Sequence, residues 1–248
     1  MKKTKALVLT FVFLAVVVVV LNVLLFAAHK PGKTSETKYF YSEADYNVYL
    51  TEHGFENEKT DKKFVSAAVR KVGEQTREGT RYFLYLDLRV TFDTAASVYQ
   101  IEANARWDKK SSYAGIQTAE GTALDFLAIT WGGGFCATDK DMYGKYYGSG
   151  NAAEFSRCES NSYGAFVWQF HERNGLYGDI LEYGTARVTL APVEANGATE
   201  LTGVNLTYIH TAHKADYGMM SLDYAQRVPH VNYRTIRSSW QTVLSVDF

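Results

Sequence analysis

The sequence is poor in cysteine, with only Cys136 and Cys158 among its 248 residues. Two cysteines are too few for the dense disulfide framework of a small secreted scaffold, and no Cys-x-x-Cys pair indicates a zinc or redox site. The pair predicts one disulfide, which would close a loop of about 21 intervening residues and stabilise the fold by about 3 kcal/mol. Two free buried thiols are the alternative.

The motifs that identify the larger enzyme classes are also missing. The chain has no Gly-x-Ser-x-Gly nucleophile elbow, no Gly-x-x-x-x-Gly-Lys phosphate loop, no Gly-x-Gly-x-x-Gly fingerprint and no His-Glu-x-x-His zinc helix. The sequence therefore predicts no cofactor and favours a protein that is not an enzyme.

Some acidic and histidine residues are candidates for chemistry. Glu120, Asp125 and Glu172 could supply a carboxylate pair for glycoside hydrolysis, because such a pair need only be close in space. We expect each of the three to be exposed and solvated. His210 and His213 end an apparent strand, where a spacing of three puts side chains on opposite faces, so no metal site is predicted.

Neither sign of charge is in excess. The chain has 26 lysines and arginines against 27 aspartates and glutamates, which gives a net charge of −1 at pH 7. Surfaces that bind nucleic acid are strongly basic, so the sequence predicts no nucleic-acid partner.

One long apolar run is present, from Ala6 to Ala28, in which Thr10 and Asn22 are the only polar residues. A helix of this length, about 35 Å at about 1.5 Å per residue, can cross a hydrocarbon core of about 30 Å. The run predicts a single transmembrane helix and makes the membrane a partner through residues 6–28.

Two alternatives exist for this run: a retained anchor or a cleaved secretory signal. Signal cores are usually about 7–15 residues long and end in a small-x-small cleavage site, whereas this run is longer and ends with Leu25-Phe26-Ala27-Ala28. Residues 1–28 are therefore interpreted as an anchor or uncleaved signal. The basic lead of Lys2, Lys3 and Lys5 favours a single-pass protein with its C-terminal domain outside the cytoplasm, and secretion after cleavage is the alternative.

The rest of the chain divides into a linker and one domain. Pro31-Gly32 would stop the helix, so residues 29–38 are predicted to be a linker. Residues 39–248 are long enough for one β-rich extracytoplasmic domain with a substantial core.

The hydrophobic pattern of this domain has mostly a period of two, which is typical of strands with one buried face. Residues 81–92 and 98–107 alternate most clearly and predict a long antiparallel hairpin. Further strands are predicted at residues 124–131, 163–171, 185–193, 200–211 and 239–248. The fold class is therefore mainly β, with an N-terminal transmembrane helix followed by an antiparallel β-sandwich or barrel-like ectodomain.

Two segments depart from this pattern. Ser42 followed by an acidic turn, with Gly54 downstream, predicts a short helix at residues 43–53. Residues 64–72 have apolar positions that fit either a helix or an alternating strand, and the sequence leaves both open.

A glycine- and tyrosine-rich region follows Trp131. Three glycines separate this tryptophan from Cys136, and the segment beyond carries Tyr143, Tyr146 and Tyr147. Tyrosine combines an apolar ring with a hydroxyl suited to stacking and hydrogen bonding, so Trp131, Tyr143, Tyr146 and Tyr147 are the candidate binding residues. The alternative is a compact loop that packs its tyrosines against the sheet.

Three functions are consistent with these observations. The favoured one is a membrane-tethered extracytoplasmic β-domain that binds a cell-envelope glycan or a protein partner, with an exposed aromatic patch around Trp131 and Tyr143. The second is a hydrolase of envelope polymers that uses acidic residues. The third is a structural component of a surface assembly.

Overall fold

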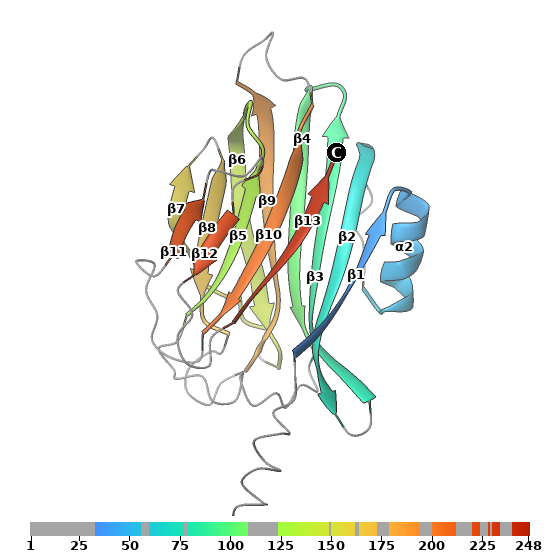
Figure 1. The fold of residues 1–248 in the computed structure, drawn as a ribbon, viewed down its shortest axis with the longest axis vertical. Coiled ribbons are helices and arrows are strands. Elements are labelled where there is room, and N and C mark those ends of the chain that lie inside the picture. Colours follow the sequence, from blue (N-terminus) through green and yellow to red (C-terminus); the bar gives the residue numbers. More distant parts are fainter. Residues whose placement is uncertain are drawn as a thin grey trace, which may run out of the picture. The chain divides into compact units, whose positions relative to one another are not determined.

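The structure is a computed structural model of the chain (Figure 1). It describes residues 33–55, 60–76, 79–108, 124–148, 150–161, 164–172, 179–193, 200–211, 220–223, 228, 230–233 and 240–248, with the backbone alone at 75–76, 158–161, 230 and 232–233. The predicted membrane span at residues 6–28 lies outside these ranges. Within them, no helix has the length and apolar character needed to cross a membrane.

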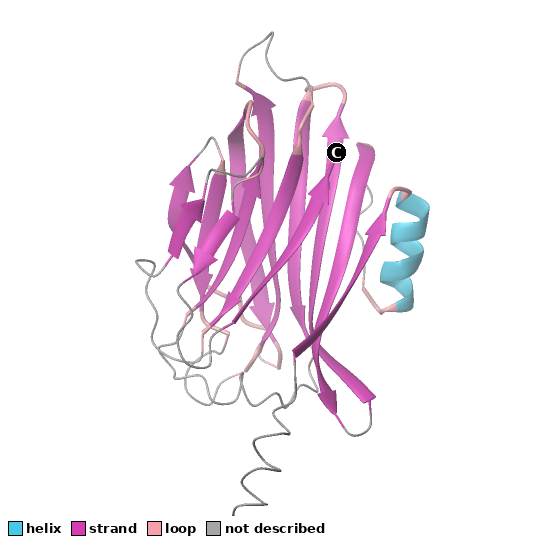
Figure 2. Ribbon diagram, in the orientation of Figure 1, coloured by secondary structure: helices cyan, strands magenta, loops and turns pink. Residues whose placement is uncertain are grey.

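The described part is mainly β and forms a sandwich of two antiparallel sheets, as the sequence predicted (Figure 2). Sheet A has the strand order β1 (Lys33–Phe40), β2 (Lys63–Thr76), β3 (Gly79–Asp93), β4 (Val98–Trp107), β9 (Leu181–Pro192) and β6 (Phe135–Tyr146). Sheet B has the order β13 (Trp240–Asp247), β10 (Gly203–His210), β5 (Asp125–Trp131), β8 (Ala165–Phe170) and β7 (Phe155–Asn161). A small ribbon pairs β11 (Met220–Asp223) with β12 (His230–Tyr233).

The predicted hairpin is confirmed as β3 and β4. Leu86 pairs with Ala105 and Leu88 with Ala103, and this register puts the apolar residues of both strands on one face. That face packs toward sheet B, where it meets Leu127, Ile129 and Leu206 in one continuous core. The alternation of apolar and polar residues therefore determines which face of sheet A is buried.

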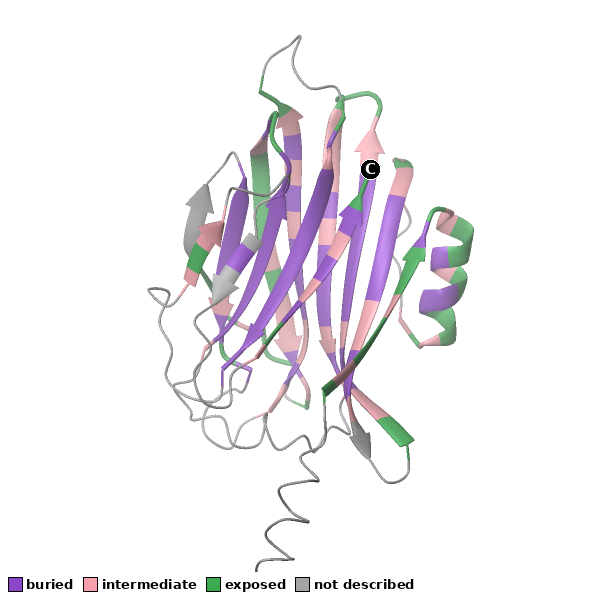
Figure 3. Cartoon of the chain, viewed as in Figure 1, coloured by how far each residue is buried: buried purple, intermediate pink, exposed green. Residues whose placement is uncertain are grey.

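Sheet B is buried on both faces, as Figure 3 shows for β5 and β10. Leu127 and Ile129 of β5 face the main core, whereas Phe126 and Ala128 belong to a second cluster with Val231 of β12. This double burial explains why β5 reads as a continuous apolar run rather than an alternating one.

The predicted helix is present as α2 (Glu43–Glu52). The side chain of Ser42 caps its N-terminus, and Gly54 follows the C-terminal residue His53 with a φ of 71°. The helix buries Tyr46, Tyr49 and Leu50 against Phe40, Ala67 and Val69 in a cluster of their own. Residues 64–72, for which the sequence fits either a helix or a strand, lie in strand β2 and are covered by this helix.

The chain divides into two compact units. Among the described residues, the smaller unit contains Lys33 and Thr34 together with Glu74–Arg81, the end of β2 and the start of β3. The larger unit contains Ser35–Gly73 and Tyr82–Phe248, and it holds both regions discussed below.

Two expectations differ from the structure. Lys33–Phe40 forms strand β1, where the sequence predicted a linker at residues 29–38. The disulfide between Cys136 and Cys158 is not formed, because Cys136 has a free thiol. Phe135 of β6 is buried in the core, so its neighbour Cys136 faces away from the interior, and the backbone of Cys158 lies in the opposite sheet.

Candidate functional site

The outward-facing side chains of sheet A form cross-strand rows on β3, β4, β9 and β6, and the register of these strands sets each row. Three adjacent rows are Tyr85, Arg106, Tyr183 and Lys145; Asp87, Asn104, Thr185 and Tyr143; and Arg89, Glu102, Arg187 and Asp141. Directly paired side chains on one face of a sheet are close enough to interact. The polar positions of four strands therefore build one continuous polar layer, of which Asp87, Arg89, Asn104 and Thr185 are buried.

An open cleft of about 960 Å³ lies over these rows and is called the aromatic cleft here. Its aromatic lining residues are Phe55, Tyr85, Trp107, Tyr143, Tyr147 and Tyr183, and its acidic and basic ones are Glu102, Arg106, Asp108, Lys145, Glu182 and Arg187. Phe55 comes from the segment directly after α2, and Tyr147 directly follows β6. Tyr85, Tyr143 and Tyr183 come from β3, β6 and β9, whereas the ring of Trp107 is buried in the core.

A repeated arrangement supports the walls of the aromatic cleft: a carboxylate pairs with a cation, and the cation lies over an aromatic ring. The three sets are Asp87–Arg106–Phe55, Glu102–Arg187–Tyr143 and Glu182–Lys145–Tyr183. In that order, the carboxylate–cation distances are 3.3, 2.9 and 3.1 Å, and the cation–centroid distances are 4.6, 5.3 and 5.6 Å. In each set the cation fixes the position of an aromatic ring, and the carboxylate balances the charge of the cation.

The structure separates the four predicted binding residues. Tyr143 is 38% exposed and lines the aromatic cleft, as does Tyr147. Tyr146 is buried and donates its hydroxyl to the carbonyl of His171 at 3.0 Å. Tyr143 and Tyr146 are three residues apart in β6, so they point to opposite faces of the strand.

Trp131 is also buried, contrary to the exposed patch that the sequence predicted around it. It occupies an inner-facing position of β5, packs against Phe166 and donates Nε1–H to the carbonyl of Phe135 at 3.2 Å. Its burial removes it from any surface site, whereas a binding role for Tyr143 and Tyr147 stays a prediction.

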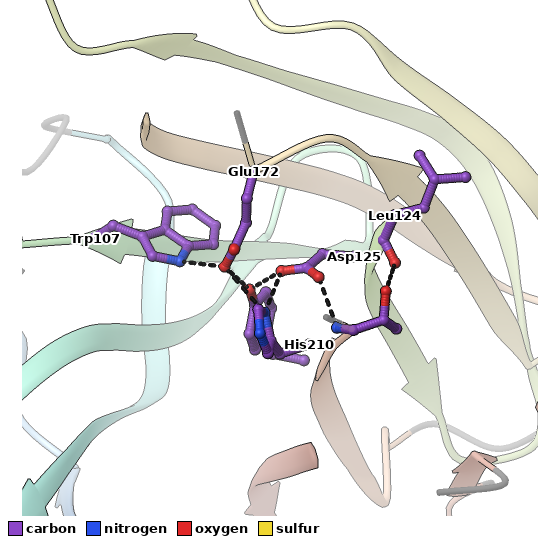
Figure 4. A network of polar contacts seen from close by, with 7 residues as sticks. Trp107, Leu124, Asp125, Glu172 and His210 are labelled. Atoms are coloured by element: carbon purple, nitrogen blue, oxygen red, sulfur yellow. Dashed lines mark hydrogen bonds and ion pairs between the residues drawn. The ribbon is translucent and has the colours of Figure 1, made fainter. Parts of the chain in front are cut away.

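A second polar feature lies inside the sandwich and is shown in Figure 4. It consists of Asp125 at the start of β5, Glu172 just after β8, and Tyr208 and His210 near the end of β10. All four are at most 5% exposed, and we call them the buried acid–histidine cluster.

Hydrogen bonds connect the members of this cluster to one another and to sheet A. The Tyr208 hydroxyl donates to Oε1 of Glu172 at 2.7 Å and also contacts Oδ2 of Asp125. His210 Nδ1 lies 3.3 Å from each of the same two oxygens. Trp107 of β4 donates Nε1–H to Glu172 Oε1 at 3.2 Å, and the backbone N–H of Thr211 donates to Asp125 Oδ1 at 2.9 Å.

The number of protons available fixes the charges in this cluster. Tyr208 has one hydroxyl proton but contacts two carboxyl oxygens, so one carboxyl group must supply a second proton. Burial, reinforced by the negative charge of Glu172, raises the pKa of Asp125 to about 7 and identifies it as this donor.

Glu172 and His210 form the charged pair of the cluster. Burial acts to raise the pKa of Glu172, but the charge of His210 and hydrogen bonds from His210, Asp125 and Tyr208 lower it to about 2. Burial acts to lower the pKa of His210, yet the two acidic neighbours raise it well above its ordinary value. A neutral Asp125, an ionised Glu172 and a protonated His210 give the cluster no net charge, which suits a dry interior.

Asp125, Glu172 and His210 also have the donor types that divalent cations use, with ligand atoms within 4.8 Å of one another. The Tyr208 hydroxyl, however, already contacts the two carboxyl oxygens that would be ligands. Glu172 Oε2 and His210 Nε2 have no hydrogen-bond partner among the described residues. Because the hydroxyl takes the bridging role, the cluster is best described as a hydrogen-bond network, and the absence of a metal stays a prediction.

The structure brings together Asp125 and Glu172, two of the three acidic residues considered for hydrolysis, but the expectation that they are exposed is wrong. They are 2% and 5% exposed, and neither lines the aromatic cleft. Glycosidase carboxyl groups are about 5–10 Å apart with a sugar between them, whereas one hydroxyl links these two. Glu120 and His213 lie outside the described residues.

The sequence contains a signal for this cluster in the position of its ionisable residues within apolar strands. Asp125 precedes five apolar residues and one threonine, at residues 126–131, and it lies on the same inward face of the strand as Leu127 and Ile129. His210 likewise lies on the same face of an apolar strand as Leu206 and Tyr208. An ionisable residue at an inward position of a buried strand needs a partner, and two such residues predict each other.

Trp107 connects the two features. Its indole donates to Glu172 in the buried acid–histidine cluster, whereas its carbonyl oxygen accepts a hydrogen bond of 2.6 Å from the hydroxyl of Tyr147, a ring of the aromatic cleft. The position of this cleft ring therefore depends on a residue that the cluster also holds.

Comparisons with known proteins add no family. No family model matches the chain, and no curated protein matches it. Among solved structures, one from work on "pH-induced modulation of Streptococcus parasanguinis adhesion by Fap1 fimbriae" is 12% identical, with a TM-score of 0.31, over 87% of this chain and 95% of that chain.

Two further solved structures show similarly low agreement. The KRT10-binding region domain of the pneumococcal serine-rich repeat protein PsrP is 12% identical, with a TM-score of 0.28, over 71% of this chain and 87% of that chain. A pore-forming protein is 6% identical, with a TM-score of 0.24, over 87% of this chain and 91% of that chain. TM-scores this low do not indicate a function for this chain. Its function is inferred below from the geometry of its own residues.

Proposed function

We propose that this protein is a membrane-tethered, extracytoplasmic binding module that holds a partner in the aromatic cleft of sheet A. The observation that carries the proposal is the cleft itself, in which rings from three strands, from Tyr147 just after β6 and from the segment after α2 converge on an open surface. Open concave surfaces with aromatic rings and convergent polar groups are the usual form of a binding site. The span at residues 6–28 would keep this surface near the membrane.

This proposal favours binding over the other two functions. The buried Asp125–Glu172 pair lacks the separation and access that hydrolysis of a polymer requires, so a hydrolase would need acidic residues elsewhere. A passive structural component would have no need for an open cleft with fixed rings.

The experiment measures binding by the full-length protein in a detergent without a sugar head group, such as a polyoxyethylene ether. The protein is immobilised and presented with solubilised bacterial envelope polymers and a panel of surface proteins, and Tyr143→Ala is compared with the unchanged chain. We expect the variant to lose at least about tenfold in affinity, because interface rings often contribute more than 1 kcal/mol.

The matched control is Tyr41→Ala. Tyr41 is 80% exposed and does not line the aromatic cleft, so this substitution removes an exposed ring at another place. Equal binding by the two variants and the unchanged chain would remove the aromatic cleft as the site.

A further inference from the structure

The acidic and basic residues that line the aromatic cleft are equal in number, and each of its cations is paired with a carboxylate, which identifies a class of ligand. We infer that the aromatic cleft takes an uncharged oligosaccharide, an inference that rests on the proposed function of the cleft. Its lining has three acidic residues, Glu102, Asp108 and Glu182, and three basic ones, Arg106, Lys145 and Arg187. Their formal charges sum to zero.

Each of the three cations already has a carboxylate partner at 2.9–3.3 Å. Arg187 and Lys145 pair with Glu102 and Glu182 of the lining, and Arg106 pairs with the buried Asp87. An anionic ligand would have to replace one of these carboxylates, and a cationic ligand would have to replace the arginine or lysine. Either exchange breaks one ion pair to make another and gains little. An uncharged ligand can instead accept hydrogen bonds from the cations and donate them to the carboxylates without separating the pairs.

The rings provide the second half of the recognition. Arg106, Arg187 and Lys145 lie over Phe55, Tyr143 and Tyr183. Tyr143 and Tyr183 also meet edge to face, with centroids 6.5 Å apart and ring planes at 86°. Such fixed rings give flat apolar surfaces beside polar groups. A sugar ring has the matching chemistry, since it has an apolar C–H face and hydroxyl groups around its edge.

The composition of the lining disfavours a protein ligand. None of the described lining residues is leucine, isoleucine, valine or methionine, and six carry charge. The centre of a protein–protein interface is apolar and depleted of charged residues. The volume of about 960 Å³ lies at the upper end of small-molecule sites, about 300–1,000 Å³, and leaves room for more than one sugar ring.

The test presents the full-length protein, in polyoxyethylene detergent, with an array of hexasaccharides of each charge class. Chitohexaose, maltohexaose, cellohexaose and mannohexaose are uncharged, the chitosan hexamer is cationic, and the hyaluronan hexasaccharide is anionic. We expect binding to at least one uncharged member, with an affinity that changes less than about twofold between 50 and 500 mM NaCl. Tyr143→Ala and Tyr183→Ala should each weaken it about tenfold, and Tyr41→Ala should leave it unchanged.

A second variant tests the charge argument directly. Glu102→Gln removes the carboxylate that pairs with Arg187 at 2.9 Å and makes the charge of the cleft more positive by one, which favours an anion near the guanidinium over Tyr143. We expect this variant to gain salt-sensitive binding of the hyaluronan hexasaccharide that the unchanged chain lacks.

The outcomes separate this inference from the proposed function. Three results would overturn the ligand class but keep the cleft as a binding site, provided that binding depends on Tyr143. These are binding confined to charged saccharides, binding confined to a protein, and an affinity that falls more than about tenfold in 500 mM NaCl. Binding that is unaffected by Tyr143→Ala and Tyr183→Ala overturns both.

Discussion

The Tyr208 hydroxyl donates to Oε1 of Glu172 at 2.7 Å in the interior of the sandwich, where both side chains are buried. The same hydroxyl contacts Asp125, so it serves as donor to one carboxyl group and acceptor from the other. This relationship makes Tyr208 the centre of the buried acid–histidine cluster.

Tyr208→Phe should therefore destabilise the protein by about 1–3 kcal/mol, because it leaves two buried carboxyl groups each short of a hydrogen bond. Urea unfolding followed by tryptophan fluorescence measures the change. Tyr183→Phe is the control, since this ring lies in the open cleft rather than in the core. Equal losses in the two variants would contradict the role given to the Tyr208 hydroxyl.

Stability should fall as the pH rises from about 5 to 8. The pKa of Asp125 is raised from its ordinary 3.8 to about 7, so the folded state holds a proton that the unfolded state has released. This stabilisation is complete below pH 3.8 and is lost as the pH rises through 7. His210, whose pKa is also raised, acts in the same direction. We expect a loss of about 1–3 kcal/mol, measured by urea unfolding across the range.

Below about pH 4 this dependence of stability on pH should reverse. Glu172 has a pKa lowered from 4.5 to about 2, so its contribution to stability is present above pH 4.5 and is lost as the pH falls toward 2. The two carboxyl groups therefore predict a stability maximum near pH 4, between their ordinary pKa values of 3.8 and 4.5.

Asp125→Asn is the control for the pH profile. The amide does not titrate and can donate to Tyr208 as the protonated acid does, so this variant should lose most of the decline between pH 5 and 8. The buried Asp87, whose pKa is also raised by burial, contributes equally to both proteins and cancels in the comparison. An unchanged decline in the variant would show that Asp125 is not the titrating group.

Tyr46→Phe tests how α2 is held on sheet A. The Tyr46 hydroxyl donates to Oδ1 of the buried Asp87 at 2.6 Å, and Asn104 and Arg106 bind the other oxygen. We expect a loss of about 1–3 kcal/mol in urea unfolding, because one oxygen of a buried carboxylate loses its donor. A loss below about 0.5 kcal/mol would indicate that the helix is held by its apolar contacts alone.

Gly144→Ala tests the close approach of β6 and β9. Gly144 pairs with Gly184, and a Cβ at residue 144 would overlap the carbonyl oxygen of Tyr183. We expect a loss of about 1–3 kcal/mol in urea unfolding, with weaker ligand binding because Tyr183 must move. Gly133→Ala is the matched control, since no atom lies within 4 Å of its added Cβ and its φ is not positive. Similar stabilities of the two variants would contradict the overlap.

Cys136 should react with a maleimide without prior reduction, because its thiol is free and half-buried on the outer side of β6. Peptide mapping by mass spectrometry identifies the labelled residue, and Cys136→Ser is the control. Labelling that requires a reductant would instead support the disulfide predicted from the sequence.

The sequence predicted those elements whose side chains alternate between core and solvent. The hairpin of β3 and β4 was visible because every second residue is apolar, and α2 was visible from its capping residue. Strand β6 was missed because glycine and charged residues fill Asp139–Gly144, where an edge strand faces water on one side.

The sites were harder to predict because they depend on contacts between distant residues. The aromatic cleft needs the pairing of β4 with β9, whose partners Arg106 and Tyr183 are 77 positions apart. The buried acid–histidine cluster needs a similar long-range pairing of β5 with β10. A local sequence pattern predicts the side of the strand on which a side chain lies, but it does not predict which residue of the next strand lies beside it.

The strands under the aromatic cleft divide two tasks between alternate positions. In β9, Tyr183, Thr185 and Arg187 line the cleft, whereas Ala186, Val188 and Leu190 belong to the core. Substitutions at the cleft-lining positions can therefore accumulate with little effect on folding, whereas substitutions at the core positions are constrained by packing. A lineage of such proteins could diversify what it recognises along these strands and keep the same sandwich.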